Sequence, residues 1–157
     1  MTTPLASLAA RRQASLDKQI LELQVPRWEG IDIWVRYKPL PHKDIRGAIF
    51  AVENAKKDKA QVELDKMTGL LVKACVAVYE KRDGKELSLS PKSADGEFTV
   101  FDPDLADALE LPEYERSAVQ TCQNLFITDG DLNAHSNQLI EFSGYSNVQA
   151  DSDLEGE

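Results

Sequence analysis

Carboxylate and amide side chains alternate at the start of "DGDLNAHSNQLIEF", residues 129–142, as oxygen ligands do at the start of a calcium-binding loop. Such a loop needs oxygen donors at positions 1, 3 and 5, glycine at position 6 and a bidentate glutamate at position 12. Asp129, Asp131 and Asn133 meet the first requirement. Positions 6 and 12 are Ala134 and Ile140, so the other two requirements fail. The stretch therefore does not predict a calcium site.

The same stretch is typical of a capped helix. Thr128, Asp129 or Asp131 offers an oxygen that can accept a hydrogen bond from a backbone N–H of the first turn. Apolar residues follow at helical spacing, namely Leu132, Leu139 and Phe142. We expect a last helix here, ended by Ser143 and Gly144.

The usual signatures of catalysis are missing from the sequence. His42 and His135 are far apart, and neither has a second His or Cys at zinc-ligand spacing. There is no G-x-S-x-G motif, and no glycine-rich phosphate loop followed by a lysine and a hydroxyl residue. Cys75 and Cys122 lie in apolar patterns, where a thiol is buried and inert. We expect no catalytic residue, cofactor or metal, and a protein that is not an enzyme.

The charge is distributed unevenly along the 157 residues. The net charge is −9, but residues 1–82 contain 15 Lys and Arg against 10 Asp and Glu, whereas residues 83–157 contain 3 against 17. The acidic half repels phosphate backbones, and the basic half has no Lys/Arg-rich run. This pattern disfavours nucleic-acid binding. It permits head-to-tail contact between copies, although solvated helix faces explain it equally well.

The sequence shows no pattern typical of a signal peptide or of a membrane span. The first residues, "MTTPLASLAARRQASLDKQ", have no apolar stretch of signal-peptide length, and no run of 18 uncharged apolar residues occurs. Two cysteines are too few for a disulfide scaffold. We expect a soluble protein of a reducing cytoplasm that does not span a membrane.

Two alternating runs predict a β-hairpin near the N-terminus. They are "QILELQV" and "IDIWVRY", joined by a "PRWEG" turn. In the second run Ile31, Ile33, Val35 and Tyr37 share one face. Trp34 falls on the opposite face, where it either lies under a helix or is offered to a partner.

Helical spacing predicts most of the remaining elements. An N-terminal helix over residues 4–18 either docks on the body or becomes ordered on a partner. Further helices are expected after Pro41 and over residues 60–81, 102–111, 116–127 and 131–142, the helix over 60–81 being central in the core. Between them, residues 82–101 contain two Asp-Gly turn signals, with a small hairpin expected around the second.

The expected fold is therefore α+β and mainly α-helical, with an N-terminal β-hairpin packed on a bundle of about five helices. Residues 1–18 form a terminal helix or arm, residues 19–146 a single globular domain, and residues 147–157 a flexible acidic tail.

Three stretches together resemble a known family. They are "LELQVPRWEGIDIWVRYKPLP", "GLLVKACVAVYEKRDGK" and "ITDGDLNAHSNQLIEFSGYSNVQADSDLEGE". They are similar to the tail assembly chaperones of long-tailed, siphovirus-type bacteriophages that infect actinobacteria, over about Leu21 to Glu157. The best local matches are two sets: Val25, Pro26, Trp28, Arg36 and Tyr37, and Gly130, Asp131, Leu132, Glu141, Phe142, Ser143 and Gly144. Phe142 stands where the family leads us to expect Trp.

The resemblance implies a role in phage tail assembly in the host cytoplasm, and absence from the mature virion. Several copies would coat the helical tape measure protein, keep it soluble, and leave as tail tube protein polymerises around it. A longer frameshifted form of the chain and homo-oligomers are also implied, and the "DLEGE" ending suits the unshifted form. We expect Trp28, Trp34 and Tyr37 to contact the client. The alternatives are a structural phage protein, such as a head-tail connector or a tail-completion or minor tail component, and a host-directed regulatory or adaptor protein.

Overall fold

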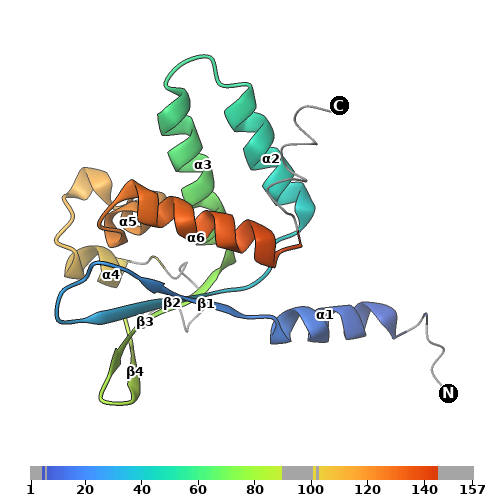
Figure 1. Ribbon diagram of the computed structural model, residues 1–157, viewed down its shortest axis with the longest axis horizontal. Helices are drawn as coiled ribbons and strands as arrows, with labels where there is room; N and C mark the ends of the chain where they lie inside the picture. The colour runs from blue at the N-terminus through green and yellow to red at the C-terminus, as the bar shows by residue number, and fades with distance from the viewer. Residues whose placement is uncertain (1–4, 6, 90–100, 102, 145–157) are drawn as a thin grey trace.

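A computed structural model describes residue 5, residues 7–89, residue 101 and residues 103–144 (Figure 1). This described part contains six α-helices, a short 3-10 helix (η2) and four strands. Their order is α1 (Leu8–Lys18), β1 (Leu21–Val25), β2 (Asp32–Tyr37), α2 (His42–Glu53), α3 (Lys59–Ala74), β3 (Cys75–Arg82), β4 (Lys85–Ser88), α4 (Pro103–Ala108), η2 (Glu113–Glu115), α5 (Ala118–Leu125) and α6 (Asp129–Phe142). The α+β class is confirmed.

The four strands form one antiparallel sheet in the order β1-β2-β3-β4. Directly paired residues share a face of a sheet, so Leu23, Val35 and Val78 lie in one row. This face is apolar, and α3, α5 and α6 lie on its side of the sheet (Figure 1). The opposite face, which we call the outer face, carries Trp34 and mostly charged neighbours.

The expected hairpin on a bundle of about five helices needs correction. β1 and β2 pair from Leu21 with Tyr37 to Val25 with Ile33, but β3 continues the sheet from β2. The two N-terminal strands are thus half of a four-stranded sheet. A two-stranded hairpin is marginal in water, and the added strands provide the missing backbone partners.

The helix predicted over residues 60–81 is confirmed over residues 60–74 and wrong over residues 75–81. α3 ends at Ala74, Cys75 takes an extended backbone with φ −67° and ψ 128°, and β3 follows without a loop. Val78 fits a helical repeat after Leu71 and Cys75, but it also fits a strand in "CVAVYEKR", which is rich in β-branched and aromatic residues. Pairing on both sides, with β2 and with β4, favours the strand.

A bulge marks the start of β3. Tyr37 pairs with Cys75 while Arg36 pairs with Ala77, so Val76 is left over in the register. Cys75 remains buried, whereas Val76 is 40% exposed. The bulge thereby brings an aliphatic side chain to the surface beside the end of α3.

The turn between β3 and β4 uses the first Asp-Gly pair. Asp83 and Gly84 both have positive φ, at 52° and 76°, as two-residue hairpins of this kind require. The hairpin expected around Asp95 and Gly96 lies outside the described residues, as do the cap expected at Asp102 and the acidic tail.

The final two helices begin with the caps that their sequences favour. In α5, Ser117 and Gln120 form a capping box with two hydrogen bonds of 3.1 Å. In α6, the Thr128 hydroxyl accepts a hydrogen bond from the Asp131 backbone N–H at 3.2 Å. Leu132 and Leu139 of α6 are fully buried. The capped-helix interpretation of residues 129–142 is confirmed.

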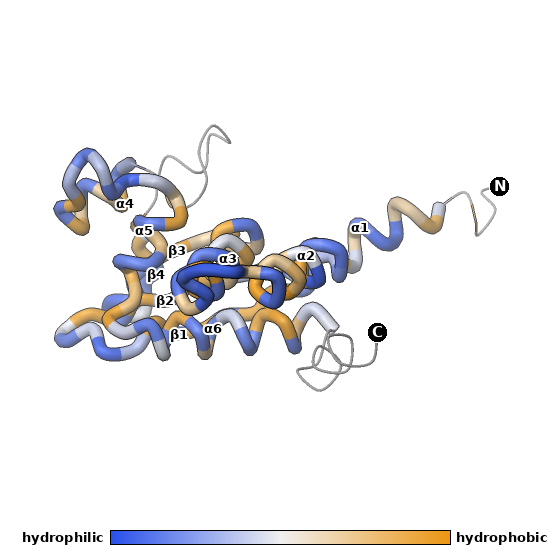
Figure 2. The backbone as a smooth tube through the Cα atoms, turned by 90° about the horizontal axis from the view of Figure 1, so that it is seen from above, coloured by the Kyte–Doolittle hydropathy of each residue, from blue (hydrophilic) through white to orange (hydrophobic). Residues whose placement is uncertain are grey.

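The N-terminal helix α1 extends away from the rest of the molecule (Figures 1 and 2). It falls within the helix expected over residues 4–18, and none of its residues is buried. Among all helices in the described ranges, none combines the length and apolarity needed to cross a membrane.

We predict opposite effects for two glycine-to-alanine substitutions. Gly84→Ala should lower the free energy of unfolding by about 1 to 2 kcal/mol, because an alanine disfavours the left-handed backbone of the β3–β4 turn. Gly47→Ala should raise it by about 0.5 to 1 kcal/mol, because Gly47 lies within α2 and an added Cβ meets no atom within 4 Å. Urea denaturation measures both. Equal signs would show that one of the two backbone assignments is wrong.

Candidate interaction surfaces

The three residues expected to contact a client do not form one surface. Tyr37 is fully buried on the apolar face of β2. Trp34 lies on the outer face, and Trp28 follows β1 in the turn that leads to β2. Tyr37 cannot touch a partner without unfolding of the core, so we remove it from the expected client surface.

Tyr37 instead belongs to a buried polar junction. Its hydroxyl lies 2.8 Å from Nδ1 of His135, and Nε2 of His135 lies 2.9 Å from the carbonyl oxygen of Gln24. A carbonyl only accepts, so Nε2 must carry the proton. Nδ1 of neutral His135 then accepts the hydrogen bond that the Tyr37 hydroxyl donates. One neutral tautomer satisfies both contacts and connects β2, α6 and β1.

Burial keeps His135 in this neutral form. His135 is 3% exposed. The ring of Phe126 packs edge-on against the imidazole ring, with 4.8 Å between the two ring centroids. Desolvation lowers the pKa of His135, and the Gln24 carbonyl and the Asp131 carboxylate oppose this only in part. The junction is therefore structural, with no proton held ready for transfer.

Trp28 also has a mainly structural role. Its indole N–H donates to the carbonyl oxygen of Leu125 at 2.9 Å, and its ring packs against the core. Its neighbour Arg27 donates to Asp131 at 2.8 Å. Together they fasten the β1–β2 turn to the end of α5 and the start of α6.

The outer face of the sheet holds a cluster of aromatic and charged side chains, which we call the outer-face cluster. Arg36 stacks on the Tyr79 ring at 4.3 Å, and the Lys81 ammonium lies 3.9 Å from the centre of the Trp34 ring. Glu22 accepts from Lys81 at 2.9 Å and lies 3.1 Å from Arg36. The complete cluster is Glu22, Trp34, Arg36, Tyr79, Lys81 and Glu86.

The charges of this cluster balance one another. The Tyr79 hydroxyl donates to Glu22, and this bond, with Lys81 and Arg36 nearby, lowers the pKa of the Glu22 carboxyl. The Glu86 carboxylate raises the pKa of Arg36. Burial and the Glu22 carboxylate raise the pKa of Tyr79. These shifts keep Glu22 and Arg36 charged and Tyr79 neutral, which suits binding better than acid–base catalysis.

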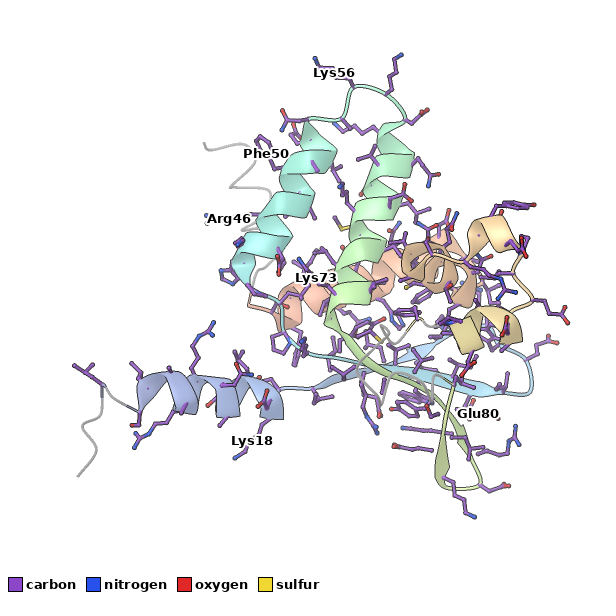
Figure 3. The ribbon with its side chains drawn as sticks, turned by 180° about the vertical axis from the view of Figure 1, so that it is seen from behind. Lys18, Arg46, Phe50, Lys56, Lys73 and Glu80 are labelled. Carbon is purple, nitrogen blue, oxygen red and sulfur yellow. The ribbon has the colours of Figure 1, made fainter. Side chains whose placement is uncertain are left out.

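A second surface is a groove between α2, α3 and α5, with a volume of about 1130 Å³. Gly47 and Gly69 line it, and a Cβ added to either glycine would meet no atom within 4 Å. Lys73 pairs with Asp44 at 3.0 Å near its lower end, where Figure 3 shows Lys73 at the foot of α3 beside α2. A hollow of about 850 Å³ beside α1 adjoins the groove, since Asp44, Lys73 and Val76 line both.

The two cysteines are buried. Cys122 is fully buried, and Cys75 is 7% exposed. Burial raises the pKa of Cys75 to about 12 and that of Cys122 well above its ordinary value, so both remain thiols at neutral pH. Among the residues with described positions, no group of three or more His, Cys, Asp or Glu side chains is placed to hold a metal ion.

Comparison of the chain with protein-family models, with curated proteins and with solved structures gives no match. The fold and surfaces of the chain define a small α+β protein with an outer-face cluster and a helix-lined groove.

Sequence reasoning missed most of both surfaces. Tyr79 and Lys81 were expected on a helix, so the sequence did not predict that they lie beside Trp34 on the sheet. The signal that could have revealed it is the strand-like composition of "CVAVYEKR". The groove depends on how α2, α3 and α5 pack, for which local sequence patterns carry no signal.

The buried histidine predicts a pH-dependent stability. Because the pKa of His135 is lower in the folded state than in the unfolded chain, protons bind preferentially to the unfolded chain as the pH falls below about 6.5. The free energy of unfolding should therefore fall between about pH 7 and pH 5, by at most about 1.4 kcal/mol per pH unit.

The variant His135→Gln should lose this slope in urea denaturation at several pH values. His42→Gln is the matched control, since His42 is the only other histidine and is exposed. A slope that persists in His135→Gln, or disappears in His42→Gln, would contradict a neutral buried His135.

Proposed function

We propose that the chain is a tail assembly chaperone of long-tailed bacteriophages, which binds the tape measure protein and keeps it soluble while the tail is built. The role needs no catalytic residue or cofactor. It requires a surface that holds a long helical client with modest strength, so that tail tube protein can displace the chaperone.

The observation that carries this proposal is the composition of the outer-face cluster. Trp and Arg are enriched among the residues that dominate the binding energy of protein interfaces, and β2 brings Trp34 and Arg36 to the outer face. Tyr79 is only 3% exposed and lies beneath Arg36, so it supports the arginine and does not itself contact a partner. Ion pairs and hydrogen bonds hold these side chains in place before a partner arrives, which lowers the entropy lost on binding.

The N-terminal strands supply this surface. Trp34 and Arg36 come from β2 and Glu22 from β1, so the β1–β2 pair presents the client contact while its other face packs on the helices. Of the three residues expected to contact the client, only Trp34 is proposed to do so. Trp28 stabilises the β1–β2 turn through its hydrogen bond to Leu125, and Tyr37 is buried in the core.

The charge of the chain supports the same role. A net charge of −9 keeps an assembly of several copies soluble and limits unspecific association. Weak sites repeated along one extended client also gain avidity. The proposal therefore places several copies of the chain on the tape measure protein in the host cytoplasm, with a longer frameshifted form of the chain among them, and none in the mature virion.

We predict that Trp34→Ala weakens client binding without unfolding the chain. Removing a central aromatic anchor costs about 2 kcal/mol, which is about a thirtyfold loss of affinity. Co-expression with the tape measure protein of the same phage, followed by co-purification and a binding titration, measures the effect. Tyr114→Ala is the matched control, because Tyr114 is 79% exposed and belongs to η2, outside the outer-face cluster.

Circular dichroism should give the same spectrum and melting curve for both variants. Unchanged binding by Trp34→Ala would refute the client surface. Mass spectrometry of purified particles tests the role itself, because a connector or tail-completion protein stays in the virion and a chaperone is absent from it.

A further inference from the structure

The arm of the molecule, residue 5 and residues 7–18 with α1, is only partly covered by the rest of its own chain. α1 has eleven residues and buries none of them, and isolated helices of this length are marginal in water. Its aliphatic side chains lie along one face at helical spacing, and the two farthest from the sheet are the most exposed, Leu5 at 82% and Leu8 at 58%. Leu16, nearer the sheet, is half-buried beside a hollow of its own chain, so a further surface would add most stability by covering Leu5 and Leu8.

The groove between α2, α3 and α5 has the complementary features. Gly47 and Gly69 leave the backbones of two helices open to close approach, and the half-buried Val72 and Val119 add apolar surface. Val76, brought outward by the bulge, lies where the groove meets the hollow beside α1. A single helix with an aliphatic face fits such a lining by ridge-and-groove packing.

Charge distinguishes the arm as the occupant. Arg11, Arg12 and Lys18 outweigh Asp17, so the arm carries about +2. The charges that line the groove itself balance, Asp44 and Asp65 against Lys66 and Lys73. A separate hollow that shares Gln120 and Gln123 with the groove adds Glu115 and Asp129, so an excess of about two negative charges lies beside the α5 side of the groove.

The arm cannot easily reach the groove of its own chain. Only Gln19 and Ile20 join α1 to β1, and two residues span at most about 7 Å. α1 continues outward from β1, so its N-terminal end points away from the body (Figures 1 and 2). A neighbouring copy can place its groove over that end without any change in the link.

We propose that α1 of one copy docks in the α2–α3–α5 groove of a second copy. The contact joins two different surfaces, so it repeats head to tail and produces a ring or an open array rather than a symmetric dimer. This inference does not depend on the proposed function, because it uses neither the outer-face cluster nor a client.

Two variants of the full chain test the contact by light scattering after size-exclusion chromatography. Leu8→Glu adds a negative charge to an exposed position of the arm, and Gly69→Gln fills the groove from a helix position that has open space above it. The wild-type chain should form oligomers whose mass rises with concentration, and each variant alone should self-associate at least tenfold more weakly. Ile127→Glu, at a 52% exposed aliphatic position between α5 and α6 that lines neither the groove nor the hollows, is the control and should behave as the wild type.

The decisive sample is an equimolar mixture of the two variants. The Gly69→Gln chain keeps a working arm and the Leu8→Glu chain keeps an open groove, so the mixture should form a one-to-one heterodimer. A mixture that remains monomeric, a monomeric wild type, or a Gly69→Gln chain that still self-associates through a symmetric α1 contact would overturn the proposal.

A second measurement covers the case in which Gly69→Gln unfolds in circular dichroism. Leu8→Cys and Gly69→Cys chains are mixed and oxidised, while the native Cys75 and Cys122 remain buried. A cross-linked heterodimer on a non-reducing gel supports the contact, and its absence from folded chains overturns it.

Discussion

The direct passage from α3 into β3 is the constraint on which the remaining structure depends. Ala74 and Cys75 are consecutive, and the Ala74 carbonyl oxygen accepts from the Lys38 backbone N–H at 2.9 Å just after β2. The foot of α3 is thereby held at the sheet. From there β3 contributes Val78 to the core, Tyr79 and Lys81 to the outer face, and Val76 to the groove. One helix-to-strand junction thus determines where both candidate surfaces form.

The Tyr37–His135 junction fixes the last helix against that sheet. A buried polar pair adds little net stability, but a pair whose partners are all satisfied penalises every other register, since misplacement leaves a buried nitrogen or hydroxyl without a partner. His135 therefore specifies both the rotation of α6 and its position along β1, through the Gln24 carbonyl. At the other end of α6, the Ser143 hydroxyl accepts from the Leu40 backbone N–H at 2.9 Å, so the helix is fixed at two points.

Local chemistry in the sequence predicts much of this fold. Alternation indicated β1 and β2, and the cap at Thr128 indicated α6, because each signal lies within a few consecutive residues. The same alternation placed Tyr37 in the row of Ile33 and Val35, which is the core row, so its assignment to a client surface disagreed with the pattern. β3 was missed because Cys75 and Val78, three residues apart, fit a helical repeat, whereas a strand brings both to the core only through the bulge at Val76. Pairing with β2 and β4, formed by distant residues, favours the strand. The groove and the partner of His135 are tertiary features for the same reason.

The proposed client site and the proposed self-contact use different parts of the chain, and this separation has a physical consequence. Copies that each carry −9 repel one another when they gather on one client, and the repulsion grows with their number. A contact between the basic arm of one copy and the acidic groove side of the next offsets part of that repulsion where the copies meet. Because each arm would gain stability by packing in a neighbour's groove, the proposed contact would let the second copy on a client bind more readily than the first. Client and self-contact then favour each other thermodynamically, and displacement of one copy weakens the hold of its neighbours.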